Sequence, residues 1–372
     1  RAARMQTLSC AHPDVMAFAS CKRLEEAKAQ VLIAGGYASD FNGEAYSSVK
    51  FQSTNTSIRG SDAFMDAVEN GLDWKTVACG GGPDYEAGAT VDVFPASHLM
   101  DEIANGTWVC GDPGMQFSDT INSWHTCPNT SPINSSNPCS EYMFIDDSAC
   151  NLASINLLKF RLPNGEFDVT MFEDACRIFI TAQDILVDHA GYPTKLIAEN
   201  SHNFRPLGLG YANLGAFLMA NGVPYDSDEG RATAAAITAI MTGCAYLASS
   251  FNAHNVGAFP GFRANREPML NVMRKHAAAV DVHCARAPER LQRRAEAIWK
   301  SVLKFGEKEE YGYRNSQVTV LAPCGTIGFM MDCDTTGVEP AIALVSYKLL
   351  AGGGTLKLVN KIVPQALSSL GY

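Results

Sequence analysis

The sequence has few basic residues and lacks paired cysteine motifs. Its 372 residues carry 29 Lys and Arg against 39 Asp and Glu, a net charge of -10. Binding a nucleic-acid backbone requires clustered cations, so the composition argues against a nucleic-acid-binding surface. The 12 cysteines include no Cys-x-x-Cys pair, and the sequence shows no secretion signal. This pattern argues against a zinc ribbon or a secreted disulfide framework and predicts a cytoplasmic protein.

Long uninterrupted apolar runs are also missing. The most apolar stretch, residues 232–247, is broken by Thr233, Thr238, Thr242 and Gly243. It predicts a buried helix of small residues and no membrane span. With 47% hydrophobic and 18% charged residues, the chain can bury a large core, as one large domain or two ordinary ones.

Hydrophobic periodicity predicts alternating strands and helices. Helical spacing marks residues 22–33, 98–109, 172–190 and 288–304, and strand-like runs mark 47–59, 115–121, 141–145 and 318–321. Such alternation is typical of an α/β architecture. The glycines at 208 and 210 are interpreted as packing positions, and residues 80–89 as a surface insertion.

The loop at residues 137–141 is the strongest catalytic candidate. It places Cys139 two residues from both Asn137 and Glu141, and Cys150 follows 11 residues later. On an extended segment, side chains two residues apart point the same way, which predicts that the amide, thiol and carboxylate face one cavity. A cysteine in a loop can also be a simple packing residue.

Two chemistries are compatible with this cysteine. A hydrolytic nucleophile needs a base, and His125 is a conceivable partner, which predicts a hydrogen bond between His125 and Cys139. However, a nearby carboxylate raises the pKa of a thiol and suppresses the thiolate. A thiyl radical forms from the neutral thiol, so Glu141 does not oppose radical chemistry.

Two further segments contain candidate binding residues. The glycine turn after the strand-like run at 318–321 offers backbone amides and a hydroxyl to an anion, or is a structural turn. It comprises Pro323, Cys324, Gly325, Thr326, Ile327 and Gly328. His125 and Cys127 have the spacing of two metal ligands, but no second pair accompanies them, so no metal site is predicted. Cys333 is interpreted as a packing residue.

Five motifs together resemble one family. They are Asn-Pro-Cys-Ser-Glu at 137–141, Cys-Asn-Leu-Ala-Ser-Ile-Asn-Leu at 150–157, Gly-Asp-Pro-Gly-Met-Gln-Phe at 111–117, Trp-His-Thr-Cys-Pro-Asn at 124–129 and Met-Met-Asp-Cys-Asp-Thr-Thr-Gly at 330–337. In this combination the chain resembles class II, adenosylcobalamin-dependent ribonucleotide reductase, from its first residue to its last.

The resemblance implies a fold and a set of roles. It implies a ten-stranded α/β barrel with a central finger loop that carries the catalytic cysteine, residues 1–372 being an incomplete barrel domain. Cys139 would be the thiyl radical that removes the ribose 3′-hydrogen, Glu141 would accept the 3′-hydroxyl proton, and Asn137 would hold the substrate hydroxyls. Cys150 would be one of two reducing thiols, and residues 323–328 would hold the substrate phosphates.

The resemblance also implies partners and shows departures. It implies adenosylcobalamin as cofactor, a ribonucleoside di- or triphosphate as substrate, nucleotide effectors, a thioredoxin-like reductant and a homodimer, with no nucleic acid or membrane. The thiol that pairs with Cys150, part of the effector loop, the last barrel strands and a C-terminal cysteine pair are expected outside residues 1–372, which predicts that the isolated segment is inactive. Threonine is common in the family where this chain has Cys324.

Two alternatives remain within this interpretation. A class I type reductase would take its radical from a separate metal-containing subunit, but Pro138 and the short spacing between Cys139 and Cys150 favour class II. The other alternative is a structural fragment that keeps the barrel without catalysis.

Overall fold

The computed structural model describes residues 3–40, 42–81, 86–308, 311–349 and 354–372. The chain divides into two compact units. Unit 1 comprises residues 1–125 and 132–146, and unit 2 comprises residues 126–131 and 147–372.

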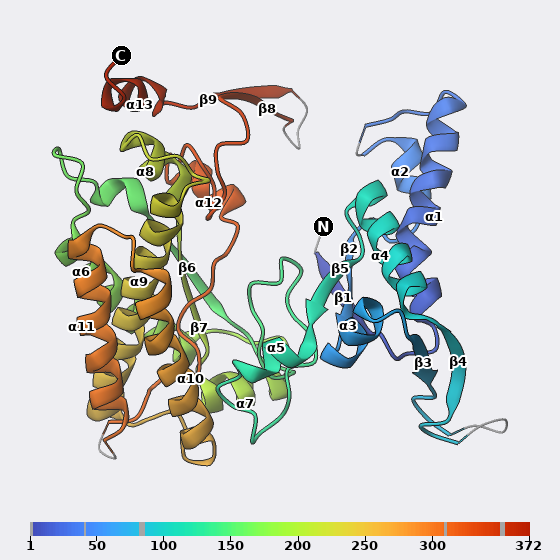
Figure 1. Cartoon of the computed structure of the whole chain (residues 1–372), viewed down its shortest axis with the longest axis horizontal. Helices are drawn as coiled ribbons and strands as arrows, with labels where there is room; N and C mark the ends of the chain where they lie inside the picture. Colours follow the sequence, from blue (N-terminus) through green and yellow to red (C-terminus); the bar gives the residue numbers. More distant parts are fainter. Residues whose placement is uncertain (1–2, 41, 82–85, 309–310, 350–353) are drawn as a thin grey trace. The chain divides into compact units, whose positions relative to one another are not determined.

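Unit 1 is built on a three-stranded parallel sheet (Figure 1). Its strands are β1 (Arg4–Ser9), β2 (Thr54–Gly60) and β5 (Gly114–Phe117), in the order β1-β2-β5. Helices α1 (Val15–Ala34) and α2 (Glu44–Ser48) connect β1 to β2. The connection from β2 to β5 contains α3 (Asp62–Glu69), the antiparallel hairpin of β3 (Asp73–Val77) and β4 (Thr90–Pro95), and α4 (Ala96–Cys110). Helix α5 (Ser118–Ser123) follows β5.

One face of this sheet supports the hydrophobic core of unit 1. Ile58 of β2 packs with Val15 of α1, Phe64 of α3 and Leu99 of α4, and all four are fully buried. Successive strand residues point to opposite faces, so Arg59 lies on the other face of β2. The loop of residues 132–141 lies on this second face of the sheet. The Arg59 guanidinium holds it there by donating to the carbonyl of Ile133.

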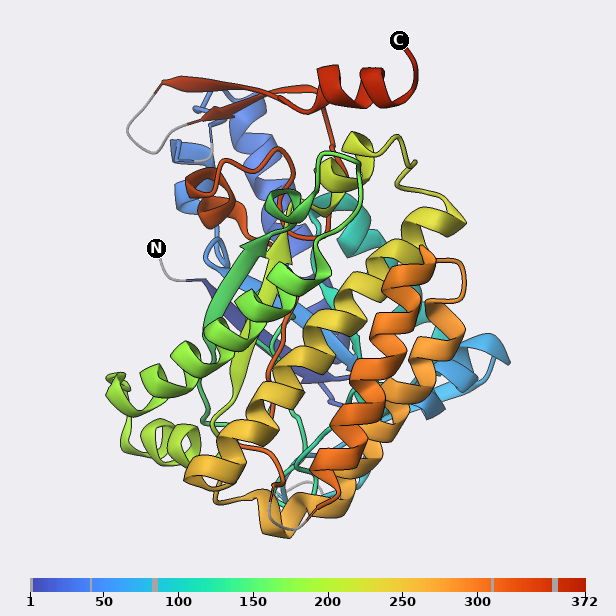
Figure 2. The ribbon, with the colours of Figure 1, turned by 90° about the vertical axis from the view of Figure 1, so that its left-hand side faces the viewer.

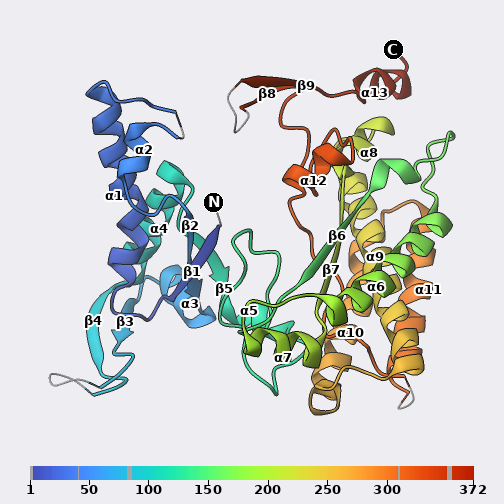
Figure 3. The same ribbon diagram turned by 180° about the vertical axis from the view of Figure 1, so that it is seen from behind.

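Unit 2 contains a second parallel pair, β6 (Asn151–Asn156) and β7 (Leu207–Ala212) (Figure 3). Thr319 forms a parallel bridge to Leu209, so residues 317–320 run beside β7. A Cβ atom at Gly210 would lie 2.4 Å from the carbonyl oxygen of Val320. The absence of a side chain therefore permits this close approach, which confirms that Gly210 is a packing glycine.

Helices make up most of unit 2. Helix α9 (Asp228–Val256) packs against α6 (Val169–His189), α10 (Phe262–His283) and α11 (Glu289–Gly306), as Figure 2 shows. It is long and apolar enough to cross a membrane, but 67% of its most apolar window is buried inside the protein. The burial confirms the predicted core helix at residues 232–247.

The remaining elements of unit 2 are short. They are the 3-10 helix η1 (Leu157–Phe160), α7 (Lys195–Phe204), α8 (Leu214–Ala220), α12 (Gly325–Met330), the antiparallel hairpin of β8 (Val345–Leu349) and β9 (Thr355–Val359), and α13 (Val363–Ser369).

The structure corrects several predicted strands. The strand predicted at 47–59 begins only at Thr54, because Phe51 has a φ of 65° and turns the chain. The one predicted at 115–121 ends at Phe117, where α5 begins, and residues 141–145 form no strand. Residues 318–321 make a single bridge. Within the predicted insertion at 80–89, between β3 and β4, residues 82–85 lie outside the described residues.

The predicted helices and the α/β class are confirmed. Residues 22–33, 98–109, 172–190 and 288–304 fall within or nearly within α1, α4, α6 and α11. In the described part of the chain, the strands form one three-stranded sheet and three two-stranded sheets, none of them closed.

Candidate active site

Cys139 lies at the centre of a tight turn. The amide of Ser140 donates to the carbonyl of Asn137 at 3.0 Å, which closes the turn over Pro138 and Cys139. Ser140 has a φ of 63°. The backbone is therefore not extended, and the prediction that residues 137, 139 and 141 share one side through strand alternation was wrong.

The turn nevertheless brings the amide and the carboxylate together. The Asn137 Nδ2 atom donates to Glu141 Oε2 at 2.5 Å, and Asn137 Oδ1 accepts from the amide of Tyr142 at 2.9 Å. Asn137 is thus fixed at both ends of its side chain. The Asn137 amide and the Glu141 carboxylate therefore meet through a turn and not through the extended segment that was predicted.

The thiol of Cys139 is exposed and held in its protonated form. Partial burial of the sulfur and the negative charge of Glu141 raise the pKa of Cys139. A raised pKa means that the thiol predominates at neutral pH. This environment is unfavourable for a thiolate nucleophile and compatible with a reaction of the neutral S–H group.

Glu141→Gln is expected to lower the pKa of Cys139, because the substitution removes the negative charge that helps to raise it. More thiolate would form at a given pH, so alkylation of Cys139 by iodoacetamide would become faster and its pH profile would shift to lower pH. Mass spectrometry of the Cys139 peptide measures this rate. Glu69→Gln, at the exposed end of α3, is the control, and an unchanged profile in Glu141→Gln would contradict the assigned interaction.

The loop before the turn is tied to the sheet of unit 1. Arg59 Nη2 donates to the carbonyl of Ile133 at 2.7 Å, and the side chain of Asn122 in α5 bonds both the amide and the carbonyl of Ile133. Thr7 of β1 donates to Ser135 Oγ at 3.1 Å. No pattern in the sequence indicated these anchoring side chains.

The hydrolase alternative predicted contact between His125 and Cys139. The side chain of His125 is buried, and its ring packs edge-on against Phe144 with centroids 5.6 Å apart. Cys139 makes no hydrogen bond to His125 in the ranges that the structure describes. The geometry and the raised pKa of Cys139 give the hydrolase no support.

Cys150 lies in unit 2, directly before β6, and is half-buried. A Cβ atom at Gly208 of β7 would lie 2.6 Å from its sulfur and 2.9 Å from Val320 Cγ2. The sulfur therefore rests over the bare backbone of Gly208. The glycine at 208 is needed for the position of this thiol.

The predicted phosphate segment changes conformation at Cys324. Cys324 has a φ of 54°, and helix α12 begins at the next residue, so the predicted turn is only the entry to a short helix. Gly325, Thr326 and Ile327 are exposed, whereas the Cys324 thiol is buried and donates to Ser154 Oγ at 3.0 Å. Because the Cys324 thiol points inward, a ligand at this segment would meet the backbone amides of Gly325, Thr326 and Ile327.

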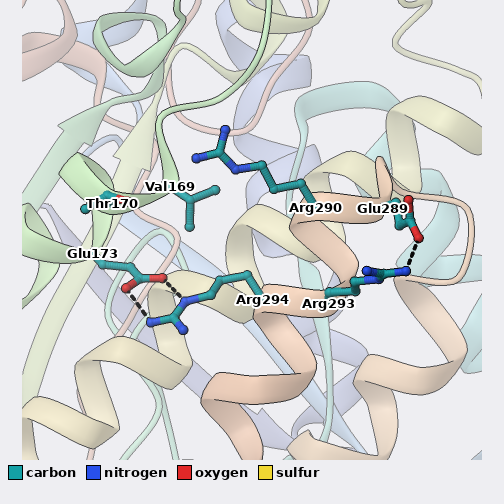
Figure 4. Close-up of a pocket in the computed structure, with 7 residues that line it drawn as sticks. All are labelled: Val169, Thr170, Glu173, Glu289, Arg290, Arg293 and Arg294. Carbon is teal, nitrogen blue, oxygen red and sulfur yellow. Dashed lines mark hydrogen bonds and ion pairs between the residues drawn. The ribbon is translucent and has the colours of Figure 1, made fainter.

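A pocket of about 670 Å³ lies elsewhere in unit 2, between the start of α6 and α11 (Figure 4). Three arginines line it, but Arg294 pairs with Glu173 and Arg293 with Glu289. Arg290 pairs with Glu166. Each arginine is thus already paired with a glutamate. None of the candidate site residues from the sequence lines the pocket, so we do not treat it as a candidate active site.

The predictions for Cys333 and for a metal site concern residues outside the turn. Cys333 is half-buried, and burial raises its pKa to about 11, which fits the predicted packing role. The described residues contain no group of three or more His, Cys, Asp and Glu side chains arranged to hold a metal ion.

Comparison with known proteins identifies the family. The family described as "Ribonucleotide reductase, barrel domain" matches residues 1–372. This chain belongs to the ribonucleotide reductase barrel-domain family. The family resemblance carried by the five motifs is therefore confirmed.

The relatives match this chain over almost its whole length. A protein of Rhodopirellula baltica named "Vitamin B12-dependent ribonucleotide reductase" is 54% identical over 372 residues, which are 100% of this chain and 35% of that protein. One of the same name from Streptomyces coelicolor is 46% identical, over 100% of this chain and 38% of its own length. The "Vitamin B12-dependent ribonucleoside-diphosphate reductase" of Mycobacterium tuberculosis is 29% identical, over 96% of this chain and 42% of its own length. The chain thus spans about a third to two fifths of these relatives.

Proposed function

We propose that the full-length protein reduces ribonucleotides to 2′-deoxyribonucleotides for DNA synthesis by radical chemistry at Cys139. The observation that carries the proposal is the turn at residues 137–141, where a protonated, exposed thiol lies between an amide and a carboxylate that touch each other. The family and the names of its relatives supply the reaction class.

Each side chain of the turn has a role in this proposal. The Cys139 thiyl radical takes the 3′-hydrogen of the ribose, which leaves a neutral thiol and a carbon radical. Glu141 accepts the proton of the 3′-hydroxyl, and Asn137 donates to the substrate hydroxyls. Hydrogen transfer requires the sulfur and the ribose carbon nearly in contact, and an exposed sulfur at the apex of a turn permits that approach.

Cys150 supplies reducing equivalents at the 2′-position. The 2′-hydroxyl leaves as water, and two thiols together provide two electrons and two protons as they join in a disulfide. The hydrogen on Cys139 then returns to the 3′-carbon, which restores the thiyl radical. The bare backbone at Gly208 lets the Cys150 sulfur sit beside β7.

Residues 323–328 are proposed to hold the substrate phosphates. The segment comprises Pro323, Cys324, Gly325, Thr326, Ile327 and Gly328. The amides of Gly325, Thr326 and Ile327 lie at an exposed helix start, and no neighbouring atom lies within 4 Å of a Cβ position at Gly325. A phosphate can approach such a backbone closely.

The proposed architecture is the incomplete catalytic barrel domain implied by the family. In this view residues 1–372 contribute to a ten-stranded barrel, and residues 132–141 form its finger loop. The parallel strands in both units and the anchoring of this loop to the face of the unit 1 sheet opposite the helices support that assignment.

Adenosylcobalamin is the proposed cofactor, and the words "Vitamin B12-dependent" in the names of the relatives support a cobalamin. When bound, it would supply the initiating radical by homolysis of its cobalt–carbon bond. The environment of Cys139 fits this cofactor. The residue is exposed, and its raised pKa keeps the sulfur protonated, so it carries the hydrogen atom that a cofactor radical would remove. Nucleotide effectors, a thioredoxin-like reductant, a homodimer and a cytoplasmic location complete the proposal.

Reduction of a ribonucleotide by the purified full-length protein is expected to require added adenosylcobalamin and a dithiol. The measurement is formation of deoxyribonucleotide by chromatography, with a diphosphate and a triphosphate substrate assayed in parallel. A reaction without the cofactor is the control. Activity that is absent with adenosylcobalamin and restored by a separate radical-generating subunit would replace this assignment with the class I type.

A further inference from the structure

Gln116 connects the sheet of unit 1 to the Cys139 turn. It is 4% exposed, lies on β5, and is paired in register with Arg59 of β2. Its Oε1 accepts from Arg59 Nη1 at 3.2 Å. Its Nε2 donates to Ser136 Oγ at 2.7 Å and to Ser140 Oγ at 3.2 Å. One buried amide thus spans from the sheet to both sides of the turn.

The two serines bracket the reactive residue. Ser136 Oγ also donates to the carbonyl of Asn137 at 2.9 Å and lies 3.3 Å from Ser140 Oγ. Ser140, next to Cys139, holds the left-handed backbone conformation that is rare for residues other than glycine. A hydrogen-bonded ring of Gln116, Ser136 and Ser140 therefore stabilises the conformation that presents Cys139.

The orientation of the Gln116 amide is fixed by its neighbours. Arg59 has only donors on its side chain, so the amide oxygen of Gln116 must face it. The NH₂ group is then directed at the two serine hydroxyls. Arg59 also holds the carbonyl of Ile133, so the same guanidinium fixes both the amide and the loop that leads to the turn.

We infer that Gln116 is a positioning residue for the Cys139 thiol, acting through Ser136 and Ser140. This inference rests on the proposed function for its catalytic consequence, although the geometric part stands without it. Hydrogen-atom transfer is sensitive to displacement of the sulfur, and a shift of about 1 Å can cost about 100-fold in rate. The sheet thereby determines where the thiol lies.

Gln116→Leu in the full-length protein is the test. The variant is expected to lower kcat by about 100-fold and to change KM much less, because the proposed phosphate contacts at residues 323–328 lie outside the turn and remain. Alkylation of Cys139 by iodoacetamide is expected to accelerate, because the turn is no longer held. This second readout needs neither cofactor nor turnover.

A double-mutant cycle separates positioning from general destabilisation. In a Ser136→Ala, Ser140→Ala background, Gln116→Leu should have little further effect on kcat or on alkylation. Thr76→Val is the matched control, since Thr76 is a fully buried hydroxyl on β3 that accepts from the amide of Asp92. It removes a buried hydrogen bond in the same unit and should leave both readouts unchanged.

The outcomes discriminate between the two proposals. If Gln116→Leu keeps wild-type kcat and alkylation, or if its effect persists fully without the serines, the positioning role is wrong. If Cys139→Ser retains turnover, the proposed function is wrong, and the alkylation cycle still decides whether Gln116 holds the turn.

Discussion

Cys139→Ser in the full-length protein is expected to reduce ribonucleotide turnover to background while the fold is retained. A serine hydroxyl holds its hydrogen more strongly than a thiol does and does not form the required radical. The side chain is exposed and makes no hydrogen bond in the described ranges, so the free energy of unfolding should change by less than about 0.5 kcal/mol. Deoxyribonucleotide formation and thermal unfolding measure the two effects.

The matched control is Cys79→Ser, which removes another exposed thiol of unit 1. Cys79 lies outside the turn, so the control should keep wild-type turnover. A Cys139→Ser protein that still forms deoxyribonucleotides would remove Cys139 from its proposed role. Equal losses in both variants would point to general thiol damage instead.

Gly210→Ala is expected to lower the free energy of unfolding by about 1–3 kcal/mol, the usual cost of added volume in a tightly packed core. The new methyl group would lie 2.4 Å from the Val320 carbonyl oxygen. That atom belongs to the backbone and cannot turn aside, so β7 and residues 317–320 must separate. Hydrogen exchange of peptides covering 207–212 and 317–321 should rise locally in the full-length variant.

Gly191→Ala provides the comparison for this variant. No atom outside its neighbours lies within 4 Å of a Cβ position at Gly191, and its φ is not left-handed. Its effect should stay within about 0.5 kcal/mol, with unchanged exchange in both peptides. Protection in Gly210→Ala equal to that of the wild type would show that the close approach is not required.

Helices were predictable because their signals are local. The apolar positions of residues 172–190 repeat at helical spacing, and α6 occupies Val169–His189. Strand limits were less accurate, because the left-handed backbone at Phe51 and the start of α5 at Ser118 interrupt runs of suitable residues. In the described residues, the predicted strand at 318–321 has one bridge, and its partner on β7 lies more than 100 residues earlier, so the local sequence does not indicate this pairing.

The chemistry of the site was more predictable than its geometry. The residue types at 137, 139 and 141 indicated an amide, a thiol and a carboxylate near one another, but the turn at Pro138 replaced the expected strand alternation. Gln116 lies within the motif at residues 111–117, but nothing in the sequence indicated its role, because a single polar residue in a strand-like run is usually solvent-facing. Its role depends on partners on β2 and on the loop that folding brings to it.

The most direct test of the central claim follows the hydrogen at the ribose 3′-carbon. A 3′-deuterated ribonucleotide, incubated with the full-length protein, adenosylcobalamin and a dithiol, should be reduced more slowly than the unlabelled substrate in a direct competition. Cys139→Ser should give no product from either. Equal rates for the two substrates, or product from the serine variant, would contradict hydrogen transfer between Cys139 and the ribose.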